Sequence, residues 1–279
     1  HWICLSDFAV ADQDGVAVLN VNEGADVESL DLYIGSGLNA DGTIVIADVA
    51  TDWDMRGSLY VGQNANLAAT LTIRDGASMT LDSAFIADGD NTTGVVELVG
   101  PGCSFQTDGS FSLGVGTGLG AFSCSDDDTV VIGGDYFQND ASSLTVSISS
   151  LVDAPIIVGG NAILGGTLNL VLEPGFETPL GTEYQLMTAA SVSDAFIVVN
   201  QDAMPSGNFF IVSYEPTRVR LIVVDEIIPG DVNYNGTVDV TDLLKLLEAW
   251  GSCPGCNEDV NGDGVVSVLD LLTLLASWT

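Results

Sequence analysis

LYIG at residues 32–35 is the first of five short apolar segments that recur at nearly equal intervals along the first half of the chain. The series continues with LYVG at 59–62, FIAD at 85–88, FSLG at 111–114 and YFQN at 136–139. Their first residues are 27, 26, 26 and 25 positions apart. A period of this size, built from short strand-like segments, is typical of solenoid proteins, in which each turn stacks on its neighbours.

A second apolar segment falls at the same place in each period. TIVI begins at Thr43, TLTI at Thr70 and VVEL at Val95, and VLNVNEGA from Val18 fits the preceding period. β-Branched residues between glycine, asparagine and aspartate corners favour strands over helices. The sequence therefore predicts a mostly β fold, a parallel β-helix with turns of about 26 residues, over residues 1–226.

The pattern shortens from residue 143 onward, and GGNAILGGTLNLVL at 159–172 carries its clearest motif. This stretch resembles the closing turns of autotransporter passenger solenoids, and the resemblance covers roughly residues 143–224. It implies a right-handed parallel β-helix and no particular activity. A β-sandwich is the alternative fold for this part, because its strands recur at similar spacings.

The chain has 279 residues, with 39 acidic and five basic side chains and a net charge of −34. Such a balance repels phosphate backbones and anionic lipid headgroups, which argues against nucleic-acid and membrane partners. No apolar run approaches the roughly 18 residues that a membrane helix needs. The first residue is His1 rather than methionine, so we expect export through a signal peptide that has been removed, and an extracellular or cell-surface location.

Two loops, 28 residues apart near the C-terminus, place oxygen-bearing residues at positions 1, 3, 5, 7, 9 and 12, with a glycine at position 6. The first loop offers Asp231, Asn233, Asn235, the backbone carbonyl of Thr237, Asp239 and Asp242. The second offers Asp259, Asn261, Asp263, the backbone carbonyl of Val265, Ser267 and Asp270. Hard oxygen ligands at this spacing suit calcium, so the sequence predicts two bound Ca²⁺ ions.

These loops differ from an ordinary EF-hand in two ways. Position 12 is aspartate instead of glutamate, and IIPG at 227–230 leaves no room for an incoming helix before the first loop. Both features resemble the type I dockerin, and the resemblance covers residues 230–279. We therefore expect a second domain at 227–279. Without incoming helices there is no helix pair to open, which argues against a calcium sensor.

The dockerin resemblance implies a cohesin-type protein partner, read by loop positions 10 and 11. These positions hold Val240, Thr241, Val268 and Leu269, where the family commonly has a serine-threonine pair. The partner contacts are therefore expected to be apolar.

The two segments that follow the loops are rich in leucine and tryptophan. The equivalent positions are Leu243, Leu244, Leu246, Leu247 and Trp250 in the first and Leu271, Leu272, Leu274, Leu275 and Trp278 in the second. Their spacing predicts two helices that bury most of these side chains against each other. A unit of about 50 residues has a small core, so we expect calcium to contribute to its folding.

The chain has five cysteines. In an exported protein, Cys253 and Cys256 are candidates for a disulfide between the two calcium loops. A redox-active CxxC is the alternative, but no βαβ unit surrounds it. Cys103 and Cys124 lie in consecutive periods, where an inter-turn bridge and buried free thiols both remain open.

The sequence lacks a recognisable catalytic constellation. His1 is the single histidine, which excludes serine triads and other histidine-based sites within the chain. SDDD at 125–128 is expected to be a solvated or cation-binding corner, with a catalytic carboxylate pair as the alternative. Asn91 begins an NTT sequon and is a candidate glycosylation site. We therefore expect a protein that is not an enzyme.

Together these features suggest a secreted structural protein. We hypothesise that its dockerin-like module mediates calcium-dependent assembly with copies of the same chain, head to tail, in an extracellular fibre or surface layer. The alternative is a subunit that binds or degrades cell-surface polysaccharide, contacts surface glycans and is anchored through its dockerin to a cohesin-type partner.

Overall fold

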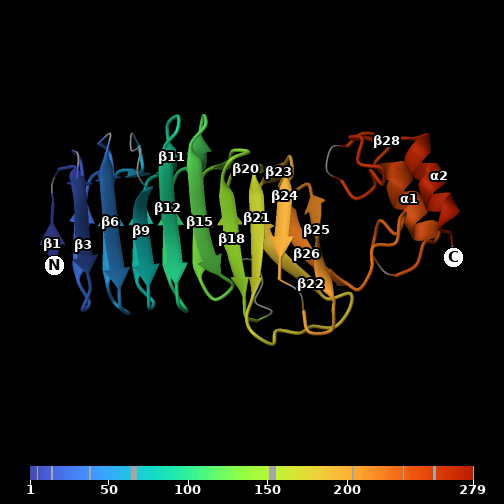
Figure 1. The fold of residues 1–279 in the computed structure, drawn as a ribbon, viewed down its shortest axis with the longest axis horizontal. Helices are drawn as coiled ribbons and strands as arrows, with labels where there is room; N and C mark the ends of the chain where they lie inside the picture. Colours follow the sequence, from blue (N-terminus) through green and yellow to red (C-terminus); the bar gives the residue numbers. More distant parts are fainter. Residues whose placement is uncertain are drawn as a thin grey trace.

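In the computed structural model the chain forms a β-solenoid, a long stack of three-stranded turns, followed by a small helical module (Figure 1). The structure describes all residues except 5, 14, 38, 64–67, 151–154, 203, 235, 254–255 and 279. The fold is a mostly β solenoid of about seven turns, with two short helices near the C-terminus. This confirms the predicted β-helix. Among the described residues, no helix has the length and apolar character needed to cross a membrane.

Each turn of the solenoid contributes one strand to each of three parallel sheets. The first sheet contains β1 (Trp2–Ile3), β4 (Asp26–Ser29), β7 (Asp52–Met55), β10 (Ser78–Leu81), β13 (Ser104–Thr107), β16 (Thr129–Ile132), β19 (Ile156–Val158) and β22 (Glu183–Thr188). The second contains β2 (Phe8–Val10), β5 (Leu32–Ile34), β8 (Leu59–Val61), β11 (Ala84–Asp88), β14 (Phe111–Val115), β17 (Tyr136–Gln138), β20 (Asn161–Ile163) and β23 (Ser191–Ser193). The third contains β3 (Gly15–Val21), β6 (Ala40–Ala47), β9 (Ala68–Arg74), β12 (Thr93–Val99), β15 (Leu119–Ser125), β18 (Ser143–Ile148), β21 (Thr167–Leu172) and β24 (Val198–Gln201).

Antiparallel strands close the C-terminal end of the stack. β26 (Arg218–Val224) pairs antiparallel with β22 on one side and with β25 (Phe209–Glu215) on the other. We call β25 and β26 the solenoid cap. The alternative β-sandwich for residues 143–224 is wrong, because β18 to β24 continue the three parallel sheets. The predicted domain boundary at 226–227 falls in the segment after β26.

The solenoid core consists of side chains that point inward from all three sheets. Alternate residues of most strands are buried, as the two-residue period of a strand requires. Trp53, Phe105, Phe111 and Tyr136 are among the largest fully buried side chains. The rings of Phe111 and Tyr136, from neighbouring turns, are stacked with centroids 5.7 Å apart. The core is therefore continuous along the stack, and each turn depends on the next for burial.

The alignment of repeats predicted from the sequence is wrong by one residue at Phe85. In the structure Ala84, not Phe85, pairs with Leu59 and with Phe111. Phe85 lies on the outer surface of the second sheet, where its ring stacks on Tyr60 at 5.2 Å. An outward aromatic is favourable there because the same column already holds aromatic rings, and successive residues of a strand face opposite sides.

Substitution of this outward ring should cost much less than substitution of an inward one. Phe111→Ala removes a fully buried ring and is expected to lower the free energy of unfolding by about 3–5 kcal/mol. Phe85→Ala removes a partly exposed ring and should cost about 1 kcal/mol or less. Urea denaturation of the two variants measures both values, and equal losses would contradict the observed register.

The SDDD segment forms a corner of the solenoid, but two of its three aspartates are buried, so the expected solvated corner is wrong for them. Asp128 accepts hydrogen bonds from the backbone N–H groups of Cys103 at 2.9 Å and Ser125 at 2.8 Å. Asp126 accepts one from the N–H of Ser150 at 2.7 Å. Burial raises the pKa of Asp128, although these donors oppose the shift. The two carboxylates therefore tie neighbouring turns together.

Cys103 and Cys124 are both free and buried in the solenoid core. Burial raises the pKa of each thiol, and nearby Asp128 adds to the effect. Of the two alternatives left open by the sequence, the structure shows buried thiols that pack as small apolar side chains.

Candidate calcium-binding and docking module

The C-terminal module contains two nine-residue helices, α1 (Val240–Glu248) and α2 (Val268–Ala276), each beginning at position 10 of a calcium-type loop. Both helices begin with a capping box. Asp239 and Asp242 form it for α1, and Ser267 and Asp270 form it for α2. Because loop position 9 is the helix N-cap and position 12 is its third residue, one spacing serves both the metal site and the helix start.

In the first loop, aspartate side chains accept hydrogen bonds from backbone N–H groups of the same loop. Asp242 accepts hydrogen bonds from the N–H of Asn233 at 3.1 Å and from the N–H of Asp239 at 2.9 Å. Asp231 accepts from the N–H of Gly236 at 2.8 Å. Position 12 is thus tied to positions 3 and 9, and position 1 to position 6.

The second loop repeats these bonds at the equivalent residues. Asp270 accepts from the N–H of Asn261 at 3.1 Å and of Ser267 at 2.8 Å. Asp259 accepts from the N–H of Gly264 at 2.6 Å. Two sequences that differ at several positions therefore adopt one loop geometry, which indicates that the shared ligand positions determine it.

The donor set of the two loops fits calcium. Gly236 and Gly264 both have φ of +85°, the left-handed conformation that the turn at position 6 requires. The ligand positions offer oxygen atoms, from side chains or, at position 7, from the backbone carbonyl, and neither loop contains histidine or cysteine. Hydrogen bonds join described candidates within each loop, between Asn233, Asp239 and Asp242 in the first and between Asn261, Ser267 and Asp270 in the second. Asn235 lies outside the described residues, and the role of each ligand stays a prediction.

The charges of the module also favour a bound cation. Asp242 and Asp270 have no exposed surface. Burial opposes ionisation of Asp270, but the backbone N–H groups that it accepts from hold its pKa below the usual value. Residues 227–279 contain eight acidic side chains and one lysine, a net charge of 1 − 8 = −7. Cations in the loops would relieve the repulsion among these carboxylates.

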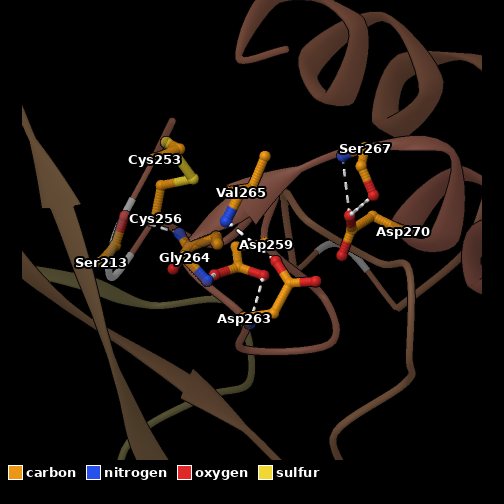
Figure 2. The surroundings of a disulfide bond; sticks show 10 residues. Ser213, Cys253, Cys256, Asp259, Asp263, Gly264, Val265, Ser267 and Asp270 are labelled. Atoms are coloured by element: carbon orange, nitrogen blue, oxygen red, sulfur yellow. Dashed lines mark hydrogen bonds between the residues drawn. A yellow bond between two sulfur atoms is a disulfide. The ribbon is translucent and has the colours of Figure 1, made fainter. Parts of the chain in front are cut away.

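Cys253 and Cys256 form a disulfide between α1 and the second loop (Figure 2). Nearby, β27 (Gly251–Ser252) and β28 (Val265–Val266) form a short antiparallel pair that joins the end of α1 to the second loop. Glu258 lies close to both sulfur atoms. Because the two sulfurs are bonded to each other, they do not supply the thiolates that a zinc site requires.

The helices bury much less apolar surface than the sequence predicts. Four fully buried residues form the module core: Val238, Leu246, Val266 and Leu274. By contrast, the exposed fractions of Leu244, Leu247, Leu272 and Leu275 are 62, 48, 57 and 49%. Both tryptophans of the module are also exposed. The prediction that most of this stripe is core is wrong, because adjacent leucines point to different sides of a short helix and only one side meets the other helix.

The four candidate partner contacts lie on the surface. Val240, Val268 and Leu269 are more than half exposed, and Thr241 is exposed as well. We define the outer helix faces as Val240, Leu244 and Leu247 on α1 with Val268, Leu272 and Leu275 on α2. These residues are four and three positions apart, so each set lies along one side of its helix.

A solenoid followed by a duplicated loop-and-helix unit with exposed apolar faces defines a modular protein with a rod and a docking unit. Residues 229–277 match the family described as Dockerin type I domain. The C-terminal module is therefore a dockerin domain, which implies calcium binding and calcium-dependent assembly with cohesin-type protein partners. Such domains are typically found in extracellular or cell-surface proteins.

Comparison with curated proteins found no match to the chain, and comparison with solved structures found none either. The resemblance of residues 143–224 to autotransporter passengers therefore stays a prediction.

Proposed function

We propose that this protein is a secreted, non-catalytic structural component in which the solenoid is a rigid spacer and the dockerin module, with one calcium ion in each loop, makes the assembly contact. The observation that supports this most directly is the pair of outer helix faces. Six aliphatic side chains, each about half exposed or more, lie on a module with little core of its own. Exposed apolar surface of this kind marks a protein–protein contact.

The proposed partner includes other copies of the chain. Residues 1–226 carry 31 acidic side chains and four arginines, a net charge of 4 − 31 = −27, so rods side by side repel one another. An end-on contact keeps these charges apart. Trp2, Val16 and Val18 are exposed on the first turn of the solenoid and offer apolar surface at the opposite end from the module. A contact between these unlike ends would build an open filament or layer.

Sedimentation of the full chain in calcium, and then with excess EGTA, tests the proposal. We expect a concentration-dependent series of oligomers in calcium that returns to monomer after chelation. A chain that stays monomeric in calcium would overturn assembly between copies. A parallel run with an added cohesin module distinguishes a cohesin partner from a second copy of the chain. A one-to-one complex with cohesin and no higher oligomers would show that the chain docks on cohesin and does not assemble with itself.

A second candidate is polysaccharide binding or cleavage. An open groove of about 620 Å³ beside the third sheet is lined by carboxylates of Glu97, Asp127 and Glu173 and by several serine and threonine hydroxyls. These groups can hydrogen-bond to sugars. The outer aromatic column, however, has its rings stacked on one another, with Tyr33 and Tyr60 only 4.9 Å apart, so their faces do not lie open to a sugar ring. Incubation with polysaccharides tests this candidate, and release of shorter sugars would support it over a structural role.

A further inference from the structure

Tyr234, at position 4 of the first loop, adopts a conformation that is unusual for its residue type. Its φ is +57°, in the left-handed region, which is unfavourable for a bulky side chain. The equivalent residue of the second loop is Gly262, with φ of +72°, for which this region is free of strain. The same backbone turn is thus made once by glycine and once by tyrosine. A strained residue persists where its surroundings stabilise it, so the side chain of Tyr234 must have compensating contacts.

The side chain of Tyr234 faces the junction between the module and the solenoid. Tyr234 lines a cavity of about 180 Å³ together with Leu180 and Val223 of the solenoid's C-terminal end. It also lines a neighbouring cavity of about 260 Å³ with Ile228 of the connecting segment and Asn257. The side chain is half-buried. Tyr234 therefore lies between the connecting segment, the solenoid and the rest of the module, whereas Gly262 has no side chain to make such contacts.

A hydrogen bond joins the same two parts of the molecule. Asn257 donates a hydrogen bond from Nδ2 to Oγ of Ser213 at 3.1 Å. Ser213 is buried in β25 of the solenoid cap, and Figure 2 shows it near the disulfide-bonded Cys256. Asn257 directly follows Cys256 in the chain. The disulfide limits the freedom of the segment that carries Asn257. Tyr234 and Asn257 belong to different segments of the module, so a ring at the junction and this hydrogen bond together would restrict rotation as well as separation.

We propose that Tyr234 and Asn257 lock the dockerin module in one orientation against the solenoid cap, and that calcium in the first loop controls this lock. Tyr234 follows the candidate ligand Asn233 directly, so an ion that fixes the loop also fixes the backbone of Tyr234 in its strained conformation. Without the ion the residue can relax to the preferred φ region, which withdraws the ring from the junction. Gly262, the equivalent residue of the second loop, has no side chain to fill this role.

Hydrogen exchange of the full chain with calcium bound, together with small-angle X-ray scattering, tests the lock. In the Tyr234→Gly variant, which copies the second loop, the amide of Asp231, which donates to the carbonyl of Ile228 at 3.0 Å, should exchange about ten-fold faster and the distance distribution should broaden. Calcium titration should still show both loops occupied, because the second loop already has glycine, Gly262, at the equivalent position. Tyr234→Phe keeps the ring and should behave as the wild type, and Asn257→Ala should give a smaller loosening. The readouts are made on the monomer, so they do not depend on the proposed assembly.

Two results would overturn the proposal. The first is a Tyr234→Gly variant with the wild-type scattering profile and exchange rates in calcium, which would show that the ring does not hold the orientation. The second is loss of calcium from the first loop in this variant, which would show that Tyr234 acts within the loop and not at the junction.

Discussion

Chelation of calcium with EGTA is expected to unfold residues 230–279 while the solenoid remains folded. Among the residues that the structure describes, the module core has four fully buried apolar side chains. Its two loops also hold the completely buried carboxylates of Asp242 and Asp270 beside other aspartates. Without a cation these charges repel one another and lack a counter-charge, and so small a core does not offset this cost. The solenoid has a separate, continuous core, so its stability does not depend on the ions.

Hydrogen exchange measured by mass spectrometry checks this expectation. In EGTA the amides of α1 and α2 should lose their protection, whereas those of β4 to β22 should keep it. Asp270→Asn should weaken calcium binding at least about ten-fold and lower the calcium-dependent stability of the module, since it removes one charged ligand. Asp127→Asn, at an exposed solenoid corner, is the matched control and should change neither property. Helices that stay protected in EGTA would show that the apolar core is sufficient.

The parts of the fold that the sequence predicts well are those set by a repeated geometric requirement. Successive turns must place strands at equal intervals, so TLTI at Thr70 pairs with TIVI at Thr43 as expected. The calcium loops are predictable for the same reason, because coordination requires oxygen atoms at fixed spacing. The sequence places Phe85 on the wrong face because both faces of its strand carry apolar residues. The pattern therefore does not show whether Ala84 or Phe85 points into the core.

The features that sequence reasoning missed depend on contacts between segments distant in the chain. The burial of Asp126 and Asp128 results from N–H groups supplied by neighbouring turns, which a local charge pattern does not reveal. The contact between Asn257 and Ser213 joins residues 44 positions apart. One signal was present in the sequence: among the positions at which the two loops differ, position 4 has the bulky Tyr234 in the first loop and Gly262 in the second.

A paired charge substitution on the outer face of α2 should abolish partner binding and leave the module folded. Leu272 and Leu275 are both about half exposed, so the double substitution L272D/L275D should lower the free energy of unfolding by about 1 kcal/mol or less. In a complex the new carboxylates would be desolvated without a partner charge, which should weaken binding at least about 100-fold, or roughly 3 kcal/mol. Binding of a cohesin module, or assembly between copies, measures the loss, and circular dichroism reports the helices.

The equivalent pair on α1, L244D/L247D, is the matched comparison. Between residues 264 and 279 the single ionisable side chain is that of the buried Asp270, whereas α1 also exposes Lys245 and Glu248. The α2 face is therefore uncharged, and a new charge should cost more there than on α1, where charged groups already lie nearby. Leu274→Ala is a control of the opposite kind. Because Leu274 is fully buried, this substitution should lower the free energy of unfolding by about 2–5 kcal/mol and unfold the module. Wild-type binding by L272D/L275D would show that the partner does not contact α2.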